Sequence, residues 1–158
     1  MRHSSALQII VVALALTSQA ASAETERWRT YSIPETGTSV DVPISIFTEQ
    51  AGVPAHGYGE RLKSADGRAD LTIQSETIAP NVSPAAFLAK MNPPAHMQYR
   101  RITSRFFAVS SYRGDKVWYN RCNFSNGFMH CVLINYPAAE EHAWDDIVTR
   151  ISLSLSGK

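Results

Sequence analysis

RCNFSNGFMHC, from Arg121 to Cys131, places the only two cysteines of the chain on either side of Asn126-Gly127. An Asn-Gly pair favours a two-residue hairpin turn, because both residues tolerate the positive φ that such a turn demands. Counting outward from this loop sets Cys122 opposite Cys131, in a non-hydrogen-bonded pair of an antiparallel hairpin. The two β-carbons come closest in such pairs, near the separation that a disulfide needs. The stretch therefore predicts a disulfide across a hairpin.

This disulfide has two alternative roles. As a structural staple it closes a loop of about ten residues and contributes roughly 2 to 3 kcal/mol, less any strain. The Cα separation of about 4.5 Å in such pairs lies at the lower edge of the disulfide range. A strained and exposed bond is easier to reduce, which permits a redox-responsive module using Cys122 and Cys131. The chain has no Cys-x-x-Cys motif, and we favour the staple.

A metal site is not indicated, although His130 directly precedes Cys131. Adjacent residues of a strand point to opposite faces, and oxidised cysteines do not bind metal ions. The remaining histidines of the expected mature chain, His56, His96 and His142, lack ligand spacing such as His-x-x-x-His. We expect no metal and no cofactor.

Catalytic motifs are absent from the sequence. It contains no Gly-x-Ser-x-Gly, no Ser-x-x-Lys and no glycine-rich phosphate loop. No catalytic residue can therefore be named, and a small envelope hydrolase with an unrecognised site stays an alternative.

The first residues have the pattern of an export signal. Arg2 and His3 precede an apolar run over residues 6–16, which is followed by the small residues Ala21-Ser22-Ala23. An uncleaved membrane anchor would need roughly 17 to 25 apolar residues, and no later segment is apolar enough to span a membrane. We expect a cleavable signal peptide over residues 1–23 and a periplasmic or secreted protein, in a compartment where facing cysteines are oxidised.

Charge and length restrict the mature chain further. The full chain has 15 Lys and Arg against 14 Asp and Glu, so removing Arg2 with the signal leaves the two signs equal in number. No net field attracts the protein to nucleic acid or membranes. Residues 24–158 are enough for one domain with its own core.

Turn signals divide this domain into short strands. Pro34-Glu35-Thr36-Gly37 separates two strands, and Asp66-Gly67 sets a hairpin in which Leu62 faces Leu71. Residues 44–47 are expected to start a helical turn, and residues 48–59 to form a loop. The expected strands are residues 28–33, 38–42, 58–63, 68–76, 98–102, 106–112, 117–125 and 128–136.

Two helices are expected beside these strands. Ser83 caps a short helix that begins at Pro84. A longer amphipathic helix near the carboxyl terminus has its apolar face at Trp144, Ile147, Val148, Ile151 and Leu155. The fold class is therefore α+β: an antiparallel sheet of about six strands, built from hairpins and a meander, covered by the C-terminal helix and the short helix.

Three stretches together are similar to the PsbP-like family. They are residues 33–43 with Pro34-Glu35-Thr36-Gly37, the Ser64-Ala65-Asp66-Gly67 hairpin, and Tyr136-Pro137 followed by residues 147–155. The chain also resembles small exported bacterial proteins of unknown function. The resemblance implies an α/β/α sandwich and a non-enzymatic accessory role as the extrinsic partner of a larger complex. It implies no binding residue, and the cysteine hairpin is not part of the pattern.

A basic and aromatic segment between residues 99 and 121 is the candidate binding site. It contains one acid, Asp115. Export argues against nucleic acid, so an anionic envelope polymer, a headgroup or an acidic protein surface is the corresponding partner. The alternative, which we favour, places the aromatic residues in the core and the arginines in solvent or in salt bridges. The basic residues are Arg100, Arg101, Arg105, Arg113, Lys116 and Arg121, and the aromatic residues are Tyr99, Phe106, Phe107, Tyr112, Trp118 and Tyr119.

The sequence therefore predicts an exported, non-catalytic accessory or binding protein with a structural hairpin disulfide and an unknown ligand. Its partner is another envelope protein or an anionic envelope polymer. The alternatives are a small envelope enzyme and a redox-responsive module.

Overall fold

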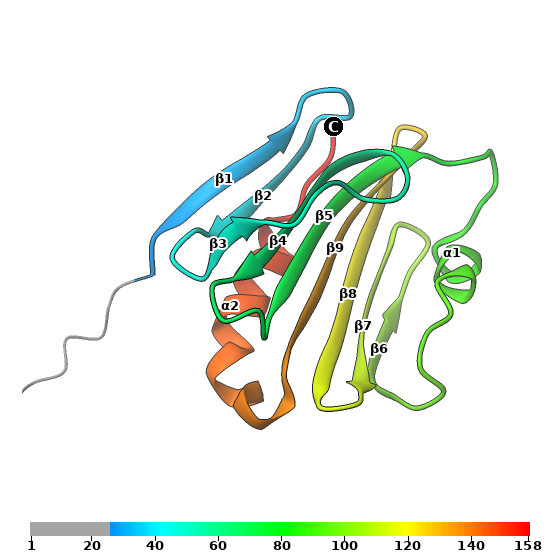
Figure 1. Cartoon of the computed structure of the whole chain (residues 1–158). Coiled ribbons are helices and arrows are strands. Elements are labelled where there is room, and N and C mark those ends of the chain that lie inside the picture. The colour runs from blue at the N-terminus through cyan, green and yellow to red at the C-terminus, as the bar shows by residue number, and fades with distance from the viewer. Residues whose placement is uncertain (1–25) are drawn as a thin grey trace, which may run out of the picture.

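A computed structural model describes residues 26–158 of the chain (Figure 1). The expected signal peptide, residues 1–23, lies outside the described residues. The elements are β1 (Trp28–Ile33), β2 (Thr38–Pro43), β3 (Phe47–Gln50), β4 (Tyr58–Ser64), β5 (Asp70–Thr77), α1 (Pro84–Lys90), β6 (Met97–Ile102), β7 (Phe106–Arg113), β8 (Lys116–Ser125), β9 (Phe128–Pro137) and α2 (Glu141–Ser154), with one 3-10 turn (Ala138–Glu140) before α2.

Seven strands form one antiparallel sheet in the order β3-β4-β5-β9-β8-β7-β6. β1 and β2 form a separate hairpin, which lies beside the sheet next to the carboxyl terminus (Figure 1). Ser39 of β2 and Ser156 exchange two backbone hydrogen bonds of 3.0 and 2.9 Å. The α+β class and the antiparallel sheet are thus confirmed.

The strand β3 was not predicted. Its first residue, Phe47, is buried and pairs with Ser64, whereas the three residues after it are exposed. A short edge strand with only one buried side chain has no alternating apolar pattern, so the sequence offered no signal for it. The expectation of a loop over residues 48–59 was wrong at this end.

The Asn126-Gly127 hairpin has the predicted register. Both residues have positive φ, 50° and 79°, and Cys122 lies opposite Cys131. The two cysteines form a disulfide with a Cα separation of 4.1 Å. Leu62 also faces Leu71, as the Asp66-Gly67 turn predicted.

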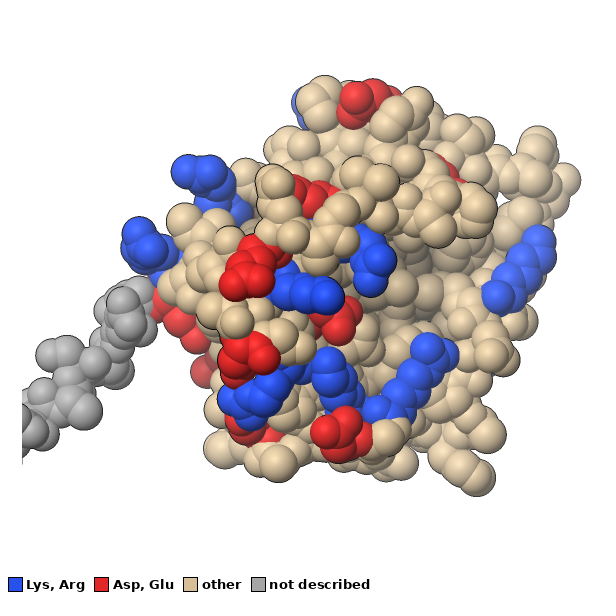
Figure 2. All heavy atoms as spheres, viewed as in Figure 1, with Lys and Arg blue, Asp and Glu red and all other residues tan. Residues whose placement is uncertain are grey.

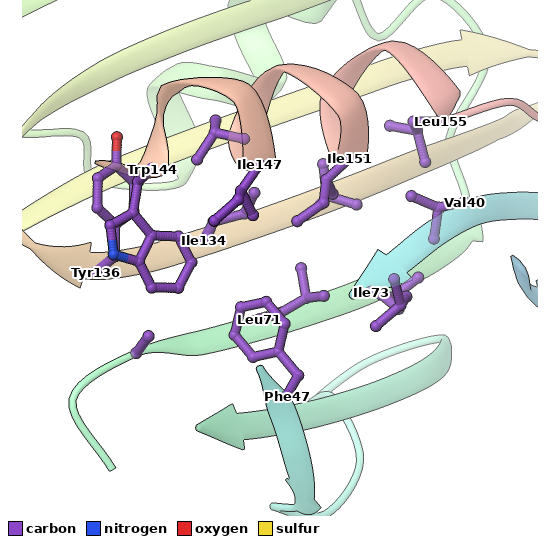
Figure 3. Close-up of a cluster of buried hydrophobic side chains, with 14 of the residues drawn as sticks. Val40, Phe47, Leu71, Ile73, Ile134, Tyr136, Trp144, Ile147, Ile151 and Leu155 are labelled. Atoms are coloured by element: carbon purple, nitrogen blue, oxygen red, sulfur yellow. The ribbon is translucent and has the colours of Figure 1, made fainter. Parts of the chain in front are cut away.

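Helix α2 covers one face of the sheet, and it lies behind the strands in Figure 1. Its predicted apolar face is buried: Trp144, Ile147, Val148 and Ile151 all join the larger core cluster (Figure 3). Trp144 stacks on Tyr136 of β9 with 5.0 Å between ring centroids. Burial of each such side chain contributes about 1.5 to 3 kcal/mol, which holds α2 on β9, β5 and β2.

Helix α1 packs on the opposite face. Ser83 caps it by accepting a hydrogen bond from the backbone N–H of Ala86, as predicted. Leu88 joins a second core cluster with Phe107 and the two cysteines. The sheet therefore lies between two helical layers, which is the sandwich that the PsbP-like resemblance implied. Within residues 26–158, no helix is long and apolar enough to cross a membrane.

Candidate anion-binding groove

The structure disperses most of the six basic residues between positions 99 and 121. Arg113 packs over the Trp118 ring, with its guanidinium carbon 4.8 Å from the centroid, and donates to the backbone carbonyl of Asn92. Lys116 faces the Asp70 carboxylate at 3.9 Å. These two side chains follow the favoured alternative of structural arginines and salt bridges.

Arg100 and Arg105 are exposed, and neither makes an ion pair or a side-chain hydrogen bond within residues 26–158. Arg100 precedes Arg101 in β6, so its side chain lies on the other face of the sheet from that of Arg101. Of the six residues, only Arg101 and Arg121 come together.

Arg101 and Arg121 stand in one cross-strand row on the face that α2 packs against. Arg101 of β6 opposes Ala108 of β7, and Ala108 opposes Arg121 of β8. Neighbouring strands lie about 4.8 Å apart, so the small methyl group of Ala108 leaves room between two long cationic side chains. The row forms a groove with an alanine floor and two arginine walls.

Phe106 supports both walls. The guanidinium carbon of Arg121 lies 4.8 Å from the centroid of this ring, and that of Arg101 lies 5.4 Å from it. Both distances are within the range at which a cation is attracted to an aromatic face. One ring therefore contacts both guanidinium groups.

Arg121 is further fixed by polar neighbours. Its Nε donates to Oδ1 of Asn123 at 3.2 Å, and its Nη1 donates to the Ser152 hydroxyl of α2 at 3.4 Å. Ser152 also shares a 2.5 Å hydrogen bond with the Tyr119 hydroxyl. Burial raises the pKa of Tyr119, and the hydrogen bond to Ser152 and the positive charge of Arg121 partly oppose that shift. Tyr119 therefore stays protonated at neutral pH.

The groove has a volume of about 260 Å³ and lies between α2 and strands β6 to β8. Its lining contains no carboxylate, and neither Arg101 nor Arg121 forms an ion pair within the described residues. Sites for drug-sized ligands are about 300 to 1,000 Å³, so this groove suits one anionic group of a larger partner. Sequence reasoning included both arginines but missed Ala108 and Ser152, whose residue types carry no signal.

The face of the sheet away from α2, which Figure 2 shows, carries basic and acidic side chains interspersed. This fits the near balance of the two signs in the whole chain, 15 basic and 14 acidic residues. A small anionic group, rather than an extended anionic surface, is what two neighbouring guanidinium groups can recognise.

The disulfide lies on the other face of the sheet. Cys122 and Cys131 are 0% and 1% exposed, and they pack in the cluster around Leu88 and Phe107. A redox-responsive disulfide must be accessible to a reductant, and this disulfide is buried. The position fits a staple.

A second polar cluster surrounds His130, on the face of β9 opposite Cys131. Nδ1 of His130 lies 2.7 Å from the Thr38 hydroxyl, and Nε2 lies 3.1 Å from that of Ser125. Thr38 contacts Thr36, which in turn contacts Ser75 of β5. No local sequence pattern indicates this cluster, because its members come from distant segments.

The Ser125–His130 pair has the residue types of a nucleophile and its base, but His130 is 0% exposed. Burial lowers the pKa of His130, so the ring is neutral at pH 7. Its second nitrogen faces a threonine hydroxyl instead of the carboxylate that orients a catalytic histidine. The cluster fastens the β1–β2 turn to the sheet. Within residues 26–158 no three His, Cys, Asp or Glu side chains gather as metal ligands.

Comparison with known proteins relates the chain to others by fold alone. No family model matches the sequence, and no curated protein sequence matches it. Among solved structures, the chain is similar to cyanobacterial PsbP (CyanoP) from Synechocystis sp. PCC 6803, with a TM-score of 0.62 and 8% sequence identity. The match covers 90% of this chain and 99% of that chain. The fold is PsbP-like.

Proposed function

We propose that the protein is an exported, non-catalytic accessory protein that binds an anionic group of another envelope component between Arg101 and Arg121. The observation that carries this proposal is the pair of guanidinium groups held around Ala108 without a carboxylate partner in residues 26–158. The two guanidinium groups line one groove, and like charges there repel one another, so a bound anion relieves that repulsion.

The chemistry of arginine supports an oxyanion as the ligand. The planar guanidinium presents a fork of N–H donors that matches a carboxylate or a phosphate. Arg121 is already fixed by Asn123 and Ser152, and both arginines rest on Phe106. Ligand binding therefore costs little additional side-chain entropy, because both arginine side chains are already held in place, and this favours affinity.

Export and a single domain over residues 24–158 belong to this proposal. The leader-like pattern of residues 1–23 and the buried Cys122–Cys131 bond both fit an oxidising compartment, periplasmic or extracellular. The PsbP-like fold fits an accessory role. The buried His130 fits a protein without a hydrolytic site, because a substrate does not reach it.

The test is an NMR titration of ¹⁵N-labelled protein, residues 24–158 with the disulfide intact, using citrate and inorganic phosphate as separate probes. We expect the largest shift changes at the backbone amides of Ala108 and Arg121 and at the side-chain Nε–H groups of Arg101 and Arg121. The double change Arg101→Gln with Arg121→Gln should abolish these shifts. Arg100→Gln is the matched control, since it removes one exposed charge from the same strand on the other face and should leave binding unchanged.

Two results would contradict the proposal. Shift changes spread evenly over all exposed arginines would show only nonspecific charge attraction. Turnover of an ester, peptide or glycan by the purified protein, lost on changing one polar residue, would show that the protein is an enzyme.

A further inference from the structure

Strand β6 is an open edge of the seven-stranded sheet. It pairs with β7 on one side, and no other strand of the described chain pairs with it on the other (Figure 1). Residues 98–101 of β6 are all exposed. An edge strand presents unpaired backbone N–H and C=O groups, and another chain can pair with them.

The register identifies which backbone groups face outward. Counting from the two-residue loop between β7 and β8, Ala108 and Arg121 form a non-hydrogen-bonded pair. Ala108 therefore directs its N–H and C=O toward β6, where it opposes Arg101. The neighbours of Arg101, Arg100 and Ile102, direct their backbone groups away from the sheet.

An added strand would extend the arginine row. A partner residue opposite Arg101 would form a non-hydrogen-bonded pair with it, with the two β-carbons about 4.5 to 5.5 Å apart. Its side chain would stand on the groove face, beside the Arg101 guanidinium. The sequence of side chains across the sheet would then be the partner residue, Arg101, Ala108 and Arg121.

The charge of the row selects the partner. A carboxylate at the position opposite Arg101 pairs with a guanidinium that has no acidic partner in the described chain. A lysine or arginine there would meet two like charges, which rejects basic strands. The register shift between Met97 and Tyr99 limits regular pairing to the few residues after it.

We infer that β6 accepts a short, extended, acidic segment of a partner protein as an eighth strand, with a carboxylate placed against Arg101 and Arg121. This inference rests on the proposed function, because it names the partner of the same groove. The inference differs from the proposed function because it requires backbone hydrogen bonds to β6 as well as charge complementarity. An anionic polymer without amide groups could pair with the arginines but could not form those backbone hydrogen bonds.

Fluorescence anisotropy tests the inference on residues 24–158 with the disulfide intact. The probe is a labelled, blocked heptapeptide of alternating valine and glutamate. The first comparison peptide has the same sequence with alternate backbone nitrogens methylated, which keeps its charge and removes donors from one edge. The second probe is inorganic polyphosphate of matched charge.

We expect the unmodified peptide to bind, and the edge-methylated peptide to bind roughly tenfold or more weakly, a difference of about 1.4 kcal/mol. Arg100→Pro should weaken peptide binding by a similar factor, because it removes an outward N–H, and an edge strand tolerates proline at such a position. Arg100→Gln, which loses the same charge and keeps the N–H, should bind as the unaltered protein does.

The double variant Arg101→Gln with Arg121→Gln distinguishes failure of the edge-pairing inference from failure of the proposed anion groove. If both peptides and polyphosphate bind equally well and all lose affinity in this variant, the edge-pairing inference is overturned and the anion groove stands. If peptide binding is unaffected by the double change, the groove itself is wrong and both proposals fail. The methylated peptide probes the unaltered protein, so the result does not depend on Arg100→Pro folding.

Discussion

The sheet face that α2 packs on differs between its two ends. At the β5–β9 end, the apolar pairs Leu71–Ile134 and Ile73–Val132 are fully buried in the core cluster that includes α2. At the β6–β8 end, the row of Arg101, Ala108 and Arg121 carries two charges beside an open groove. Burying an unpaired guanidinium costs several kcal/mol, and here α2 only borders the groove, leaving Arg101 exposed and Arg121 half-buried. One end serves stability, and the other is free to serve binding.

Truncating the covered end should have the largest effect. Ile151 of α2 is 0% exposed inside the larger core cluster, so Ile151→Ala should lower the free energy of unfolding by about 2 to 5 kcal/mol, through lost burial and a residual cavity. Urea denaturation followed by circular dichroism measures this change.

The matched control is Leu153→Ala, two residues along the same helix. Leu153 is 71% exposed beside the groove, and its truncation should change stability by no more than about 0.5 kcal/mol. Equal losses for the two variants would show that the covered and open ends do not differ in this way.

Removing the staple should have the next largest effect. Replacing Cys122 and Cys131 together by serine opens the loop that the disulfide closes, and the model of chain entropy gives a loss of roughly 2 to 3 kcal/mol. The cysteines lie on the opposite face from the groove, so citrate and peptide binding should persist below the lowered melting temperature. Binding that responds to reduction of the intact protein would instead revive the redox-responsive reading.

A smaller, pH-dependent effect should come from His130. Its pKa is lowered in the folded protein by burial, whereas an unfolded histidine titrates near about 6.5. Below that pH the unfolded chain takes up a proton that the folded chain resists, so stability is complete above about pH 6.5 and falls as the pH is lowered further.

Melting temperatures between pH 8 and pH 5 check this direction, and His130→Gln should show a shallower decline because its side chain does not titrate. The other histidines of the described chain, His56, His96 and His142, are exposed and are the same in both proteins. An unchanged decline in His130→Gln would assign the pH dependence to carboxylates.

Local signals in the sequence predicted much of the fold. Asn126-Gly127 and Asp66-Gly67 define their own turns, so the cysteine pairing and the Leu62–Leu71 register followed from counting. The strand β3 was not predicted because only Phe47 of its four residues is buried, so its side chains show no alternating pattern, and its other residues are held mainly by backbone pairing with β4. Strand pairing that rests on backbone groups leaves little trace in residue type.

The groove was only half predictable. Arg101 and Arg121 were among six candidates, but nothing local separated them from Arg113, which packs on Trp118, or from Lys116, which faces Asp70. The distinction depends on where α2 ends its cover of the sheet, and this is a property of packing between distant segments. The His130 cluster was invisible for the same reason.

The variant with the smallest expected effect on stability, Arg101→Gln, is the most direct test of the difference between the covered end and the open end. Arg101 is exposed and makes no ion pair within residues 26–158, so Arg101→Gln should change the free energy of unfolding by no more than about 0.5 kcal/mol. Relief of the repulsion between the two guanidinium groups opposes the loss of the contact with Phe106. The same variant should weaken binding of the acidic peptide roughly tenfold. A substitution that weakens binding without lowering stability identifies a residue that the fold does not require. A loss of several kcal/mol in Arg101→Gln would instead place Arg101 among the structural residues and remove the basis for treating the open end as a binding surface.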